Sequence, residues 1–189
     1  VDVHGVVQEE IEAFTAVTPH DYLLCIFSFA SISETVLRRP VSMAINFHDS
    51  LLPTYAGFNT TTWAIADDQS THGVSWHVMT PVLDGGPLLL QEEVPIYPGD
   101  RAVQLNTRCF EAAVSSFTRL ARQLAGGRLS QTPQRLERRS LFRRNRRPHG
   151  ACLLTFDDAA RASRWVRALD FGPIDNPVGT PKICLLYTS

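Results

Sequence analysis

The chain has 189 residues, of which 44% are hydrophobic and 20% are charged, as in an ordinary soluble globular protein. The net charge of −1 excludes a general electrostatic attraction to nucleic acid or to anionic membranes. No apolar run is long enough to span a bilayer, and no signal peptide is recognisable. We therefore expect a cytoplasmic protein without a membrane partner.

Helical and extended patterns alternate along the chain. Continuous apolar runs such as DYLLCIFSFA and MAINFH favour strands that are covered on both faces, as in a parallel sheet. A tight turn around LDGG separates two later strands. In chain order we predict a helix at 8–16, a strand at 21–30, helical turns at 33–39, a strand at 43–48, a helix at 58–68, strands at 72–79 and 87–96, and helices at 100–127 and 158–169, with a strand at 151–156 between these two. This alternation predicts an α/β fold with a mostly parallel sheet.

The clearest helical pattern covers residues 100–127. Asp100 is a good N-cap, and the pair Gly126–Gly127 ends the pattern. Apolar residues recur at helical spacing and predict the buried stripe, which comprises Val103, Phe110, Val114, Phe117, Leu120 and Leu124.

Four cysteines lie far apart and form no CxxC pair, so we interpret them as small buried hydrophobic residues: Cys25, Cys109, Cys152 and Cys184. No cluster of metal ligands, Walker pattern or GxGxxG fingerprint is present in the sequence. We therefore expect no metal, ATP or nicotinamide cofactor.

Three polar residues are candidates for chemistry. Asn46 and His48 alternate on the strand at 43–48 and so share one face at its carboxyl end, where open α/β sheets bind ligands. Asp84 lies in the glycine-containing turn between two later strands. An amide donor, an imidazole and a carboxylate suit acyl transfer to an amine, which needs an oxyanion donor and a proton carrier. The alternative is that these groups only satisfy backbone atoms at the rim of the sheet.

Two sequence blocks carry a family resemblance. INFHDSLLP, at 45–53, resembles the Asn-x-His-x-Ser-Leu-Leu-Pro signature of the 10-formyltetrahydrofolate-dependent formyltransferases, which include methionyl-tRNA formyltransferase and glycinamide ribonucleotide formyltransferase. THGVSWHVMTPVLDGGPLLLQEEVPI, at 71–96, is similar to the second block of that family. The resemblance implies a Rossmann-like formyltransferase fold. It also leads us to expect that the chain begins part-way through that fold, without the first strands.

The resemblance also implies roles for individual residues. Asn46 corresponds to the Asn that binds the oxyanion, His48 to the His that transfers protons, and Asp84 to the Asp that orients this His. The co-substrate would be 10-formyltetrahydrofolate, without a metal. The residues implied to contact it are Ser50, Leu51, Leu52 and Pro53.

The chain departs from the transfer-RNA enzyme in this block. Asp49 follows the motif His where many relatives have Pro, and Thr54 stands where that enzyme has Arg. The segment is more similar to formyltransferase domains of nonribosomal peptide synthetases. The resemblance thus implies an amine acceptor, either an aminoacyl group on a carrier protein or an aminoacyl-tRNA, and leaves open that the chain belongs to a larger synthetase.

Charge divides the chain into three parts. Residues 1–134 carry 7 basic and 14 acidic side chains, whereas residues 135–147 carry seven arginines and one glutamate. We predict a partial catalytic domain at 1–128, an Arg-rich linker at 129–150, and a small α+β appendage at 151–189. The linker is either solvated or a contact for phosphate groups.

Two other functions remain open from the sequence. Water in place of the amine would make the protein a formyltetrahydrofolate hydrolase. A pocket left open by absent strands would make it a folate-binding or docking domain without catalytic activity.

Overall fold

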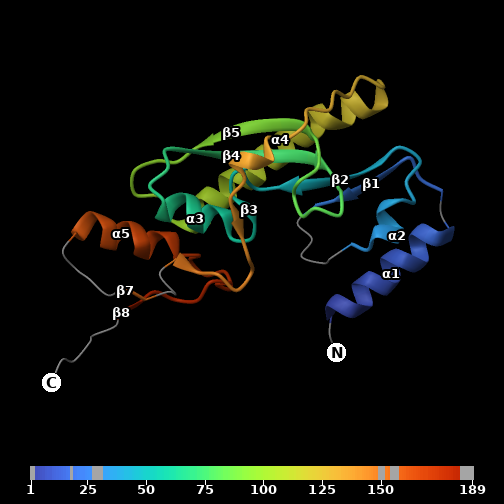
Figure 1. Ribbon diagram of the computed structural model, residues 1–189. Coiled ribbons are helices and arrows are strands. Elements are labelled where there is room, and N and C mark those ends of the chain that lie inside the picture. Colours follow the sequence, from blue (N-terminus) through green and yellow to red (C-terminus); the bar gives the residue numbers. More distant parts are fainter. Residues whose placement is uncertain (1–2, 18, 27–31, 149–151, 154–157, 184–189) are drawn as a thin grey trace.

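The computed structural model describes residues 3–17, 19–26, 32–148, 152–153 and 158–183 (Figure 1). Its centre is a four-stranded sheet with the strand order β1–β2–β4–β5. The strands are β1 (Tyr22–Cys25), β2 (Met43–His48), β4 (Thr71–Val78) and β5 (Leu88–Pro95). All four occur where strands are predicted. Residues 27–30 of the predicted strand at 21–30 lie outside the described residues.

The α/β class is confirmed, and the central sheet has mixed strand directions. β1 pairs with β2 in parallel, whereas β2–β4 and β4–β5 are antiparallel. The connection between β4 and β5 is short, so these two strands form a hairpin and cannot pair in parallel. Two small parallel pairs lie outside the central sheet: β3 (Ala56–Gly57) with β6 (Leu141–Phe142), and β7 (Cys152–Leu153) with β8 (Lys182–Ile183).

The core lies between the sheet and the long helix α4 (Ala102–Ala125), which packs on β4 and β5. Trp76 is its largest fully buried side chain and contacts the ring of Phe47 edge-on at 5.1 Å between centroids. The indole Nε1 of Trp76 donates a hydrogen bond of 2.9 Å to Ser116 Oγ on α4. This bond satisfies a polar group that burial would otherwise leave without a partner.

The predicted buried stripe of α4 is wrong in part. Phe110 and Val114 are 47% and 72% exposed, although Leu120 is buried. The buried face instead consists mainly of small residues: Ala102, Leu105, Cys109, Ala112, Ala113, Ser116 and Leu120. Small side chains let the helix approach the sheet closely, so the larger hydrophobic residues lie at its sides.

The predicted N-cap of α4 is also displaced by one residue. Arg101 is the N-cap, and the Asp100 carboxylate accepts a hydrogen bond of 2.6 Å from the backbone N–H of Tyr97. Asp100 also forms an ion pair with Arg108, in the second turn of the helix. The Asp100 carboxylate therefore closes the turn before α4, and its ion pair with Arg108 stabilises the beginning of the helix.

The remaining helices are α1 (Val3–Val17), α2 (Glu34–Leu37), α3 (Thr60–Ala66) and α5 (Ala159–Ala168). α5 packs against α3, and Trp165 of α5 is buried with Ala102 at the start of α4. The predicted C-terminal appendage thus shares a small apolar cluster with the start of α4. Of the strand predicted at 151–156, only residues 152–153 are described.

Cys25 and Cys109 are buried, as predicted for small hydrophobic residues. Among the described residues, no helix is long and apolar enough to cross a membrane.

Candidate active site

The site begins at the carboxyl end of β2. Asn46 lies directly opposite His77 in the antiparallel β2–β4 pair, so the two side chains are cross-strand neighbours on one face. Asn46 Nδ2 is 3.2 Å from His77 Nε2. His48, two residues further along β2, points from the same face and is only 6% exposed.

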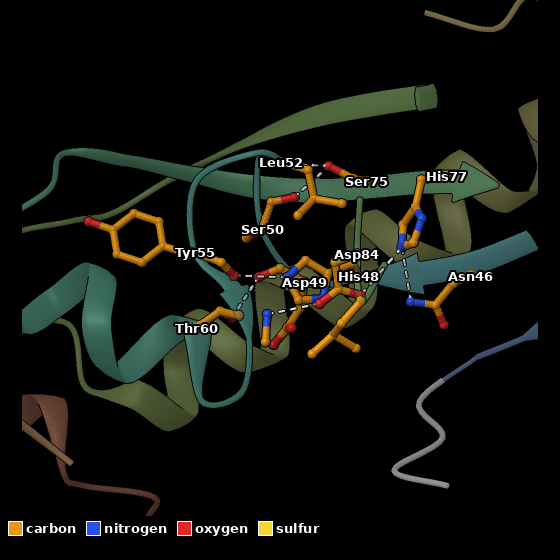
Figure 2. Close-up of polar contacts among 12 residues, drawn as sticks. Asn46, His48, Asp49, Ser50, Leu52, Tyr55, Thr60, Ser75, His77 and Asp84 are labelled. Atoms are coloured by element: carbon orange, nitrogen blue, oxygen red, sulfur yellow. Dashed lines mark hydrogen bonds and ion pairs between the residues drawn. The ribbon is translucent and has the colours of Figure 1, made fainter. Parts of the chain in front are cut away.

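Asp84 reaches these side chains from the turn between β4 and β5 (Figure 2). Its backbone has a φ of 49°, in the left-handed region, which Asp tolerates better than most residues. The carboxylate lies 3.8 Å from His48 Nδ1 and 3.5 Å from His77 Nε2. The backbone N–H of Gly57 also donates a hydrogen bond of 2.8 Å to Asp84 Oδ2. One buried carboxylate is therefore shared by two imidazoles and a backbone donor.

The outer nitrogens of the two imidazoles are both bonded to backbone carbonyls. His48 Nε2 donates to Tyr55 O at 2.9 Å, and His77 Nδ1 donates to Val78 O at 2.9 Å. A carbonyl oxygen can only accept, so each of these nitrogens carries a proton. The inner nitrogens therefore face Asp84 as lone pairs unless one imidazole binds a second proton.

The pKa of the Asp84 carboxyl is lowered overall. Burial is the largest single effect and acts in the opposite direction, since it raises the pKa. The hydrogen bond with His77, the charge of His48, and the Gly57 N–H together outweigh burial. Asp84 is therefore ionised at neutral pH and can stabilise a positive imidazolium.

The side chains of Asn46, His48, His77 and Asp84 line a cavity of about 800 Å³. The cavity extends to Ser33 near α2 on one side and to Phe110 and Phe171 on the other. Its size is in the range of cavities that bind molecules as large as a folate. The exposure of Phe110 is explained by this position, because its ring forms part of the cavity wall.

The segment predicted to contact folate lies next to β4. Ser50, Leu51, Leu52 and Pro53 are not among the residues that line the cavity. Ser50 and Leu52 are buried, and Ser75 Oγ donates to Ser50 O at 2.6 Å and accepts from Leu52 N at 3.1 Å. The segment folds back onto β4 because its polar backbone groups find partners there. In this structure it anchors the chain that follows His48.

His77 is a site residue that the sequence alone did not identify. Its neighbour Trp76 is the large core residue, and alternation along β4 explains why His77 faces the other side. The sequence signal would have been a His opposite Asn46, but that pairing depends on the register between β2 and β4. A register irregularity between Trp76 and His77 in the β4–β5 pairing lies at the same point.

Within the residues that the structure describes, no group of three or more His, Cys, Asp or Glu side chains is arranged to hold a metal ion. The side chains described above are an Asn, two His and an Asp around a cavity.

Sequence comparison relates the chain to enzymes that transfer formyl groups. The formyl transferase family model matches residues 4–120. Phosphoribosylglycinamide formyltransferase of Escherichia coli is 36% identical over 98 residues, which are 52% of this chain and 46% of the relative. Methionyl-tRNA formyltransferase of Koribacter versatilis is 32% identical over 126 residues, 67% of this chain and 40% of the relative. The chain thus spans less than half the length of these two curated relatives.

Structural comparison agrees on the fold. A sugar N-formyltransferase from a Shewanella species has a TM-score of 0.74 at 18% identity, covering 89% of this chain and 67% of that structure. HypX from Aquifex aeolicus, in complex with tetrahydrofolic acid, has a TM-score of 0.74 at 20% identity, covering 91% of this chain and 29% of that structure. With a family match over more than half of its residues, the chain belongs to the formyl transferase family.

Proposed function

We propose that the chain transfers a formyl group from 10-formyltetrahydrofolate to an amine. The observation that supports this most directly is the meeting of Asn46, His48 and Asp84 at one cavity of about 800 Å³. An oxyanion donor, a proton carrier and an ionised carboxylate are the groups that this reaction needs. Similar proteins are named as formyltransferases that act on different amines. Their names support the same transfer of a formyl group by this chain.

In the proposed reaction, the amine nitrogen attacks the formyl carbon, and the bond from that carbon to N10 of the folate breaks. Asn46 donates a hydrogen bond to the oxygen that becomes negative. Its amide has two N–H groups, so one can remain with His77 while the other binds the oxyanion. His48 accepts the proton lost by the amine and delivers it to the departing N10. Asp84 stabilises His48 while it is positively charged.

His77 has a supporting part in this proposal. It contacts both Asn46 and Asp84, at 3.2 Å and 3.5 Å respectively. It therefore fixes the oxyanion donor relative to the carboxylate that serves His48. Because it touches neither reacting group in this scheme, we assign it a positioning role.

For the acceptor we propose a primary amine of an aminoacyl group, on a carrier protein or on a tRNA. Relatives differ in their named acceptors, which include a phosphoribosylglycinamide, methionyl-tRNA and amino sugars. The absence of Arg after SLLP and the acidic charge of residues 1–134 favour the carrier protein.

The test is release of tetrahydrofolate from 10-formyltetrahydrofolate in the presence and absence of each candidate amine. We expect release that depends on an amine, together with a formylated product. Release at the same rate without any amine would identify a hydrolase. Folate binding without release under all conditions would identify a binding domain and would contradict the proposed transfer.

A further inference from the structure

Gln134 lies in the segment predicted to be a linker. Its side chain is hydrogen-bonded to the turn that carries Asp84. Its side-chain Nε2 donates to the backbone carbonyl of Asp84 at 2.9 Å and to that of Gly86 at 2.6 Å. Two residues earlier, Thr132 forms a backbone bridge with Leu88 at the start of β5. The carboxamide thus uses both of its N–H groups on one turn.

That turn needs an external support. Asp84 has a positive φ of 49°, a conformation that costs free energy in residues other than glycine. Its carboxylate must nevertheless remain between His48 and His77. A hydrogen bond to the carbonyl of Asp84 itself restricts rotation about its backbone, and hence the direction of its side chain.

The same segment also holds the opposite side of the site. Ser140 Oγ accepts a hydrogen bond of 2.7 Å from Tyr55 N, and Ser140 O accepts one of 2.8 Å from Ala56 N. Tyr55 O in turn accepts a hydrogen bond from His48 Nε2, and Gly57 N–H donates one to the Asp84 carboxylate. Residues 132–142 therefore support both backbone segments that contact the His48–Asp84 pair.

We propose that Gln134 is a positioning residue that sets the direction of the Asp84 carboxylate toward His48 and His77. This inference rests on the proposed function of Asp84, and it extends the functional site into the predicted linker. The Gln134 side chain acts only as a donor here, because its Oε1 is buried without a hydrogen-bond partner among the described residues. Its two N–H groups are therefore the part of the side chain that the proposal requires.

The test compares three variants in the formyl-transfer assay. Gln134→Met keeps the length and removes both donors. Gln134→Glu keeps the shape but, when ionised, faces two carbonyl oxygens with a negative charge. Gln131→Met is the matched control, since Gln131 is an exposed residue of the same segment.

We expect Gln134→Met to lower kcat about 10- to 100-fold with a nearly unchanged KM for the folate, as misplacement of a catalytic group does. The acidic limb of the kcat/KM profile should move to higher pH. The reason is that Asp84 loses the close contacts with His77 and His48 that lower its pKa. Gln131→Met should match the wild type in both measurements.

Thermal unfolding and folate binding establish whether each variant is folded. A folded Gln134→Met variant with wild-type kcat and pH profile would overturn the inference. If Gln134→Met does not fold, Gln134→Glu is assayed across pH instead, because only its protonated carboxyl can donate a hydrogen bond. Its activity relative to the wild type should then fall as pH rises, and a constant ratio would overturn the inference. Absence of transfer by the wild-type chain would instead contradict the proposed function.

Discussion

The imidazole of His48 and the carboxylate of Asp84 face each other across 3.8 Å between Nδ1 and Oδ2, with both side chains only 6% exposed. This distance exceeds that of a direct hydrogen bond. It is short enough for strong electrostatic coupling, and catalytic hydrogen bonds are often longer before substrate binds. The pair can therefore act together once the cavity is filled.

Replacement of His48 should remove the proposed proton carrier. We expect His48→Ala and His48→Gln to lower the rate of formyl transfer about 10²- to 10⁴-fold, the usual contribution of a general acid–base group. The Gln variant retains a donor for Tyr55 O, so it separates proton transfer from support of the loop. Single-turnover rates at saturating folate measure the effect. Near-normal turnover in the Gln variant would exclude His48 as the proton carrier.

Replacement of Asn46 tests its proposed role as the oxyanion donor. Asn46→Ala should lower kcat roughly 10²- to 10³-fold, the effect of one lost oxyanion hydrogen bond. Folate affinity, measured by titration of intrinsic fluorescence, should change little. If affinity were lost while bound molecules still reacted at the normal rate, Asn46 would be a cofactor ligand instead.

His72 should make folding stability depend on pH. Burial is the main cause that lowers the pKa of His72, and the charge and carbonyl of Asp49 only partly oppose it. The unfolded chain then binds a proton near pH 6.5 that the folded chain does not bind. The contribution of His72 to the free energy of unfolding is fully present above about pH 6.5. It is lost as the pH falls toward the lowered pKa, by up to about 1.4 kcal/mol per pH unit.

His72→Gln provides the comparison, because Gln can still donate to Asp49 O, the partner of His72 Nε2 at 2.7 Å. Urea unfolding of both proteins at pH 7.5 and 5.5 gives the two free energies of unfolding. The difference between the two pH values should be smaller in the variant. Equal differences would show that His72 does not titrate as proposed.

The Arg-rich segment distinguishes between the two acceptor classes. Arg143, Arg146 and Arg147 are exposed, and none of the described residues forms an ion pair with them. Arg144 is left unchanged because its guanidinium lies 5.0 Å over the ring of Phe58, which lines the cavity. We expect replacement of the three arginines by Ser to leave formylation of a carrier-bound aminoacyl group nearly unchanged.

If the acceptor is an aminoacyl-tRNA, a different result is expected for these arginines. Contacts with tRNA phosphates would give an affinity that falls steeply with salt, with a log–log slope that grows with the number of contacts. Binding to aminoacyl-tRNA is therefore measured at several salt concentrations for the wild type and the triple variant. Tight, salt-dependent binding that disappears in the variant would favour tRNA over a carrier protein.

Several local elements of this protein follow from the sequence alone. The apolar run at 43–48 predicts β2 with its observed bounds, and alternation places Asn46 and His48 on one face. The turn that carries Asp84 between two strands can be predicted as well, because turn-forming residues affect the backbone only over a few positions. These features depend on neighbours in the chain, so a single sequence contains the information needed to predict them.

The distant residues that complete the site depend on how separate elements pack together. His77 joins Asn46 because of the register between β2 and β4, and Gln134 joins Asp84 because the segment after α4 returns to the β4–β5 turn. The buried face of α4 likewise depends on how closely the helix packs on the sheet, which hydrophobic spacing alone did not predict. Register and long-range hydrogen bonds arise when separate elements pack together, and no local pattern of residues specifies them.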